Sequence, residues 1–219
     1  MIILDVEEAC DSVSNFHITE EVKKNLNKFK NLEGTCKEKL NTLSEMAKAY
    51  IGYDGYNTLI QAIDLSFHTV LEFNFGAFKN VRGYLDTLIV AESRVGKSST
   101  AEALQRLYGL GAFTSLAGNS ATIPGIIGGS TKVNGNYQTR AGLIPMNHRG
   151  LVIFEELAKC NTNLVKELTD IRSSNQVRIA RVSGTLTLPA LVRMITLTNV
   201  KNTTNKIKPI NSYPNGVDI

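Results

Sequence analysis

Three short segments of the sequence end in side chains that suit phosphate and metal chemistry. The segment AESRVGKSS, residues 91–99, closes with a Gly-Lys-Ser-Ser run. The segment LVIFEE, residues 151–156, sets two carboxylates behind four apolar residues, and a third apolar run ends in Thr198-Asn199. An ammonium, a hydroxyl, paired carboxylates and an amide are the groups with which proteins hold a nucleoside triphosphate and its metal ion.

The first segment is similar to a phosphate-binding loop, although Ala91 stands where that pattern has glycine. In such a loop backbone N–H groups cradle phosphates, the lysine (Lys97) reaches the β and γ phosphates, and the next hydroxyl (Ser98) binds Mg²⁺. Alanine fits at position 91 if its φ stays negative. The alternative role for Ser98 and Ser99 is to cap the following helix. The predicted nucleotide-binding residues are Glu92, Ser93, Arg94, Val95, Gly96, Lys97, Ser98 and Ser99.

The acidic pair and the asparagine would complete a hydrolytic site. Glu155 would hold Mg²⁺ through water together with Ser98, and Glu156 would orient and deprotonate the attacking water. Asn199 would hydrogen-bond the γ-phosphate and that water. The structural alternatives are that the acids cap the following helical region and that the asparagine only ends its strand. Paired acids at the end of a buried strand favour the hydrolytic interpretation, so Lys97, Glu156 and Asn199 are the predicted catalytic residues.

These segments need alternating strands and helices to bring them together. Three apolar runs have the length of buried strands: residues 84–91, 150–156 and 193–199. Two stretches show helical periodicity: residues 97–110, closed by Gly109 or Gly111, and residues 161–174. Residues 176–189 have the pattern of a hairpin that turns at Ser183-Gly184. The alternation predicts a parallel sheet covered by helices on both faces.

The region upstream of the loop has a different pattern. Helical periodicity begins after the capping residue Thr19 and continues, with a break at GYDGY, to about residue 75. Residues 17–75 are therefore predicted to be mostly helical.

Composition limits the class of protein. The 219 residues are 42 % hydrophobic and 20 % charged, which is typical of a globular chain. The sequence has no apolar run long enough for a membrane span, and its three cysteines show no disulfide or zinc spacing. A cytoplasmic location with no membrane partner is the expectation.

Residues 1–109 carry 12 Lys/Arg against 15 Asp/Glu, and residues 110–219 carry 12 against 5. The basic second half indicates either a polyanionic partner or a solvated basic face.

With these motifs in order, the chain resembles the minichromosome maintenance (MCM) family of AAA+ replicative helicases from about Phe16 to Asn199. The phosphate loop and residues 176–199, a hairpin followed by a strand, carry the resemblance, together with three further segments: YIGYDGYNTLIQAIDL, GAFTSLAGNSATIPGI and VNGNYQTRAGLIPMNHRGLVIFEELAK. The resemblance implies a P-loop NTPase fold, an αβα three-layer core with a parallel sheet preceded by a helical segment. It also implies ATP and Mg²⁺ as cofactors, a hexameric ring, and single-stranded DNA as partner.

The family grips DNA with two basic hairpins, and the resemblance carries this role to specific residues. Arg181 falls where the family has its channel lysine, with Arg178 nearby on the same hairpin. Lys132 or Arg140 would serve the insert hairpin, which would turn at Asn134-Gly135. Guanidinium and ammonium groups suit contacts to the sugar-phosphate backbone.

The resemblance also sets expected boundaries. Residues 1–15 are the end of an upstream region, 16–80 the helical part of the ATPase module, 81–205 the P-loop core and 206–219 a truncated end. Glu155 replaces the family's aspartate, and no arginine finger is recognisable in residues 200–219. The chain therefore looks like a fragment.

The predicted function is the ATPase core of a DNA helicase that couples ATP hydrolysis to translocation on single-stranded DNA and to duplex unwinding in replication. One alternative is a MoxR-like or chelatase-like AAA+ remodeller of proteins. The other is a nucleotide-binding assembly module with little hydrolysis, because a missing finger would slow phosphoryl transfer by orders of magnitude.

Overall fold

The computed structural model describes residues 18–30, 34–52, 56–117, 121–133, 136–181 and 184–199, which divide between two compact units, Met1–Thr42 and Leu43–Ile219. In the first unit, helix α1 (Glu20–Lys30) begins after Thr19, whose hydroxyl accepts a hydrogen bond from Val22 N at 3.3 Å. This confirms the predicted cap. Helix α2 (Cys36–Ile51) crosses from the first unit into the second.

The second unit contains a four-stranded parallel sheet in the order β3-β10-β7-β4. The bounds of its strands are β3 (Thr87–Ala91), β4 (Ala112–Ser115), β7 (Leu151–Glu155) and β10 (Arg193–Asn199). Strand β10 pairs with both β3 and β7, so it joins the phosphate loop to the acidic pair. The prediction of a parallel α/β sheet is confirmed.

Two apolar clusters cover opposite faces of this sheet. Side chains alternate between faces along a strand. In β7, Leu151 and Ile153 pack with helices α3 (Asn57–His68) and α4 (Lys97–Tyr108). Val152 and Phe154 instead pack with helix α7 (Thr162–Ser174). The two faces thus make the three-layer αβα core that the sequence predicts.

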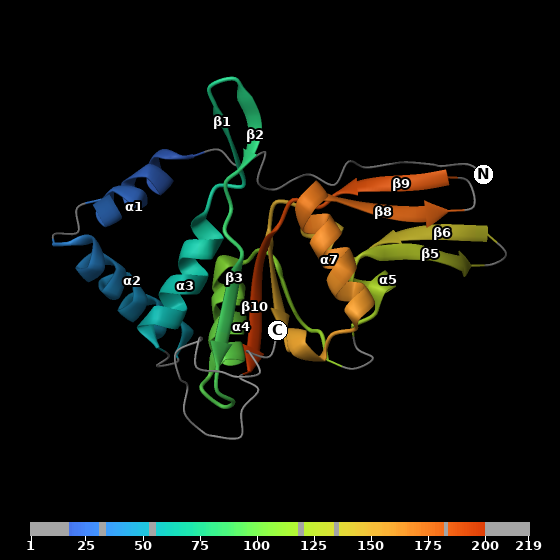
Figure 1. The fold of residues 1–219 in the computed structure, drawn as a ribbon. Helices are drawn as coiled ribbons and strands as arrows, with labels where there is room; N and C mark the ends of the chain where they lie inside the picture. Colours follow the sequence, from blue (N-terminus) through green and yellow to red (C-terminus); the bar gives the residue numbers. More distant parts are fainter. Residues whose placement is uncertain are drawn as a thin grey trace. The chain divides into compact units, whose positions relative to one another are not determined.

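Two β-hairpins extend from the α7 side of the core (Figure 1). The first joins β5 (Gly128–Val133) to β6 (Asn136–Ala141), and the second joins β8 (Gln176–Arg181) to β9 (Gly184–Pro189). The predicted turn at Asn134-Gly135 lies outside the described residues, as does Ser183 of the second predicted turn, whereas Gly184 begins β9. Strands β5 and β8 contact each other, and Val177 and Ile179 of β8 are buried. The two hairpins therefore pack side by side.

The upstream region is only partly helical, because α3 ends at His68 rather than near residue 75. Thr69 is extended, and the Arg193 guanidinium donates to its carbonyl oxygen from Nε at 2.9 Å and Nη2 at 2.6 Å. These bonds take up the free carbonyl at the helix end. The chain then forms a hairpin of β1 (Glu72–Phe75) and β2 (Phe78–Arg82), so the helical prediction for residues 69–75 is wrong.

Other elements differ from the sequence prediction in length or were not foreseen. Strand β3 begins at Thr87 instead of residue 84, and strand β4 was not predicted. The remaining elements are short: α5 (Ile123–Ile126), α6 (Leu143–Met146) and the 3-10 helix η2 (Leu157–Lys159). Over the described ranges, the helices are all too short or too polar to cross a bilayer.

Gly128 controls how the two hairpins meet. Its φ of +120° suits glycine, and an added Cβ would lie 2.7 Å from Ile179 Cδ1 and 2.8 Å from the Arg140 carbonyl oxygen. We expect Gly128→Ala to lower the free energy of unfolding by about 3 kcal/mol, from backbone strain plus overpacking. The control is Gly109→Ala, where φ is +64° and a Cβ would meet nothing within 4 Å. That change should cost only about 1 kcal/mol. Equal costs in urea unfolding would contradict this account of the hairpin contact.

Candidate nucleotide site

The side chains predicted to act on a nucleotide meet at the carboxyl edge of the sheet. Asn199 pairs with Ala91, and Leu197 of the same strand pairs with Glu155. Ser115, the last residue of β4, also pairs with Glu155. Parallel pairing brings four strand ends to one edge, which is where open α/β sheets bind ligands.

The loop that follows β3 has the backbone of a phosphate cradle. Ala91 lies inside β3, so its backbone is extended and alanine fits there without strain. Arg94 and Gly96 have positive φ values of 66° and 76°, and α4 starts directly after them. Backbone N–H groups in such alternating conformations point into one concavity.

Gly96 is the N-cap of α4, and no side chain caps this helix end. Capping therefore does not explain Ser98 and Ser99, and the proposed alternative role for them is wrong. The first N–H groups of a twelve-residue helix without a side-chain cap suit an anion such as phosphate.

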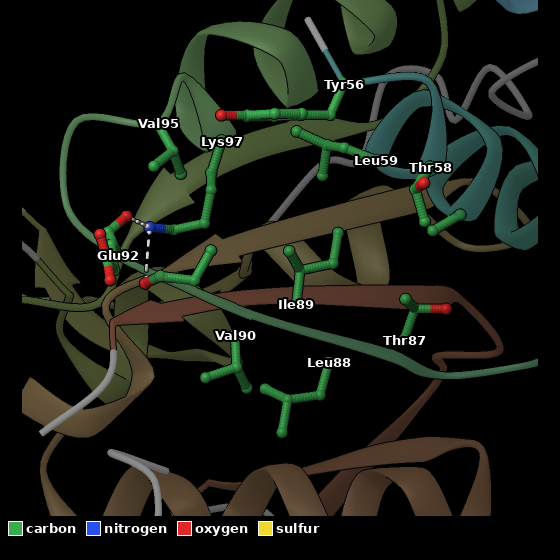
Figure 2. Close-up of a pocket in the computed structure, with 12 residues that line it drawn as sticks. Tyr56, Thr58, Leu59, Thr87, Leu88, Ile89, Val90, Glu92, Val95 and Lys97 are labelled. Carbon is green, nitrogen blue, oxygen red and sulfur yellow. Dashed lines mark hydrogen bonds between the residues drawn. The ribbon is translucent and has the colours of Figure 1, made fainter. Parts of the chain in front are cut away.

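Lys97 is buried, with 7 % of its surface exposed. Its ammonium donates to the backbone oxygens of Ala91 at 3.1 Å and Glu92 at 2.6 Å, and to Asn199 Oδ1 at 2.8 Å. Figure 2 shows this ammonium directed at the loop backbone. Burial lowers the pKa of Lys97, and the negative charge of Glu155 opposes that shift. The three N–H groups thus lie at the loop, and a phosphate would take over one or more of these bonds.

The two predicted metal ligands are in direct contact, because the Ser98 hydroxyl donates to Glu155 Oε1. A hydroxyl beside a carboxylate is an oxygen donor set of the kind that Mg²⁺ prefers. Glu155 ends β7 and Ser98 lies in the first turn of α4, so two different elements position the pair. These residues fit a Mg²⁺ ion bound together with phosphates.

Glu156 stands in a strained backbone conformation, with φ 59° and ψ 43°. Its carboxylate forms an ion pair with Lys159 through Oε1, and Ser115 Oγ donates to its Oε2 at 3.4 Å. Its own N–H donates to Leu197 O at 2.9 Å, which ties the turn to β10. Sequence reasoning missed Ser115 and Lys159. Ser115 ends a strand that was not predicted, whereas Lys159 lies only three residues from Glu156 and was within reach.

An apolar cavity of about 780 Å³ lies beside the loop. It runs from the start of α3 along β3 to the loop, as Figure 2 shows. Tyr56, Leu59, Val95 and Lys97 are among the residues that line it. A nucleotide whose phosphates lay on the loop would find a cavity here for its remaining parts.

The predicted DNA-binding residues occupy the two hairpins. The side chains of Lys132, Arg140 and Arg178 are exposed. Lys132 pairs with Tyr137 and Arg140 with Gly129, so alternation places Lys132 and Arg140 on opposite faces of their hairpin. Arg181 is the last residue of β8, paired with Gly184, and its side chain lies outside the described part of the structure.

A family model described as the MCM P-loop domain matches residues 25–212. No curated protein matches the chain. The family match spans the phosphate loop, the acidic pair, the hairpins and strand β10.

The left-handed backbone of Glu156 can be tested by comparing the stability of its glycine and alanine variants. Glycine adopts its left-handed conformation without the penalty of about 1 kcal/mol or more that a Cβ brings. We expect Glu156→Gly to be more stable than Glu156→Ala by about that amount in urea unfolding. The exposed helical residue Lys166 is the control position. There the alanine variant should be more stable than the glycine variant by about 1 kcal/mol. The same order at both positions would show that Glu156 is not held in this conformation.

Proposed function

The chain belongs to the MCM P-loop domain family, and from this premise we propose that it binds ATP with Mg²⁺ and couples hydrolysis to movement along single-stranded DNA. We further propose that it acts as one subunit of a ring, by analogy with its family. One observation carries the proposal: Lys97, the Ser98–Glu155 pair and Asn199 meet at one edge of the sheet.

The proposed nucleotide lies with its phosphates on residues 92–99 and its base and ribose in the cavity beside β3. Lys97 contacts the β and γ phosphates, and Ser98 and Glu155 hold the metal ion. When bound, Mg²⁺ neutralises charge that develops on the phosphates. The apolar lining at Leu59 and the exposed ring of Tyr56 support base binding, because both offer apolar surface in the cavity that Lys97 also lines.

In this proposal Glu156 and Asn199 act on the attacking water. With Lys97 donating to Asn199 Oδ1, the amide nitrogen of Asn199 remains as the donor toward phosphate or water. Glu156 accepts the proton of the water. Its carboxylate must exchange the Lys159 ion pair for this contact, and the pair is an exposed one of modest strength.

The hairpins supply the proposed DNA contacts. Arg178, Lys132 and Arg140 are exposed cations on two ribbons that pack side by side, and Arg181 stands at the end of β8. Such cations bind the phosphate backbone of a strand without reading its bases. They account for the basic second half of the sequence better than a merely solvated face does.

The nucleotide site is tested by Lys97→Ala. We expect ATP·Mg²⁺ binding to weaken between about 10- and 100-fold, because hydrogen bonds to a charged partner contribute about 1.5–3 kcal/mol. Titration calorimetry measures the change directly. Lys166→Ala, which removes an exposed lysine from α7, should bind ATP like the unaltered chain. If both variants bind equally well, the nucleotide lies elsewhere.

The DNA contact is tested with Arg181→Ala and Arg178→Ala. Each should weaken binding of an oligothymidine strand and reduce the slope of log affinity against log salt by about 0.7 per lost phosphate contact. Arg106→Ala, which removes an exposed arginine from α4, is the control and should change neither. Unaltered binding in both variants would show that the β8–β9 hairpin does not contact DNA. ATP turnover that responds to a protein client but not to DNA would favour the remodeller.

A further inference from the structure

Arg94 occupies the middle of the phosphate loop in a backbone conformation that arginine rarely adopts. Its φ is +66°, in the left-handed region that favours glycine. Strained residues of this kind gather at functional sites, where the side chain serves a purpose that glycine cannot serve. Glu92 and Val95, which stand on either side of Arg94 in the chain, line the cavity beside the loop (Figure 2). Arg94 therefore starts at the rim of the proposed nucleotide site.

The guanidinium of Arg94 is available for a ligand. Its side chain is exposed, and among the described residues it forms no hydrogen bond or ion pair. Lys97, by contrast, donates within the protein to Ala91 O, to Glu92 O and to Asn199 Oδ1, which uses the three N–H groups of its ammonium. A guanidinium carries its donors in a planar fork that matches two phosphate oxygens. The loop thus offers a phosphate more donors from Arg94 than from Lys97.

The charges at the carboxyl edge of the sheet give this guanidinium a purpose. The loop with the start of α4, and the end of β7 with η2, carry three carboxylates and two ammonium groups besides Arg94: Glu92, Glu155, Glu156, Lys97 and Lys159. Lys159 is already paired with Glu156. Without Arg94 the acids outnumber the cations, and like charge opposes the binding of a polyanion. Arg94 makes the two signs equal in number.

The terminal phosphate of ATP has the greatest need for a cation. In loops of this kind the backbone N–H groups cradle the inner phosphates, and the lysine reaches the outer two. The terminal phosphate would lie toward Glu155 and Glu156, to which the proposed function gives the metal ion and the attacking water. A guanidinium beside this phosphate offsets their negative charge and binds two of its oxygens. ADP has no such phosphate and would gain nothing from the contact.

We propose that Arg94 binds the terminal phosphate of ATP and makes the site select the triphosphate over the diphosphate. This role rests on the proposed function, because the phosphates must lie on residues 92–99. The left-handed backbone keeps the side chain at the rim of the site, with a loss of stability that glycine would avoid.

The test compares Arg94→Gly with the unaltered chain, by titration calorimetry with ATP·Mg²⁺ and with ADP·Mg²⁺ and by urea unfolding. Glycine removes the guanidinium, so we expect about a ten-fold loss of ATP affinity, the low end for hydrogen bonds between charged groups. ADP affinity should not change. Because glycine also relieves the backbone, the midpoint of urea unfolding should rise. Arg94→Lys keeps a positive charge without the planar fork and should recover part of the ATP affinity.

Arg149→Gly is the matched control, because Arg149 has a φ of +65° in the turn before β7, at the opposite edge of the sheet. It should bind both nucleotides normally. Equal losses for ATP and ADP in Arg94→Gly, or no loss for either, would overturn the role of Arg94 while leaving the proposed function intact. So would normal ATP binding with weaker DNA binding, since the guanidinium would then contact DNA. Absence of ATP binding by the unaltered chain would overturn both.

Discussion

The double pairing of strand β10 is the constraint on which the rest of the site depends. Because β10 lies in parallel register between β3 and β7, Asn199 stands beside the start of the phosphate loop and Leu197 stands beside Glu155. The Lys97 bond to Asn199 and the Glu156 N–H bond to Leu197 both follow from that register. A shift of one residue would turn the buried side chains of β10 to the wrong faces and separate these groups.

The site also depends on how its charged side chains are paired within the protein. Lys97 is buried, and the strand ends and the loop supply oxygen acceptors for its ammonium. The Glu155 carboxylate accepts a hydrogen bond from the Ser98 hydroxyl. The Glu156 carboxylate pairs with Lys159 and accepts a hydrogen bond from Ser115. Buried polar groups are costly without such partners. Each of these contacts has an ionised donor or acceptor and is therefore charge-assisted.

Much of the fold could be predicted from the sequence, for identifiable reasons. Strand β7 begins with four consecutive apolar residues, and α4 and α7 end in Gly109 and Asn175 with the left-handed conformation expected of a C-cap. The hairpin β1–β2 could not be foreseen, because the end of α3 depends on Arg193, which follows Thr69 by 124 residues. Strand β4 has four half-buried residues and no clear alternation. The Lys97–Asn199 contact likewise joins residues 102 positions apart, so the sequence could predict the members of the site but not their distances.

The central claim is that Ser98 and Glu155 together hold the metal ion of a bound nucleotide. A double-mutant cycle of Ser98→Ala and Glu155→Gln tests it most directly, with ATP affinity measured by calorimetry in the presence and absence of Mg²⁺. Two ligands of one ion predict non-additive losses, with a coupling of about 1 kcal/mol or more that disappears without Mg²⁺. Additive losses that are the same with and without Mg²⁺ would contradict the account.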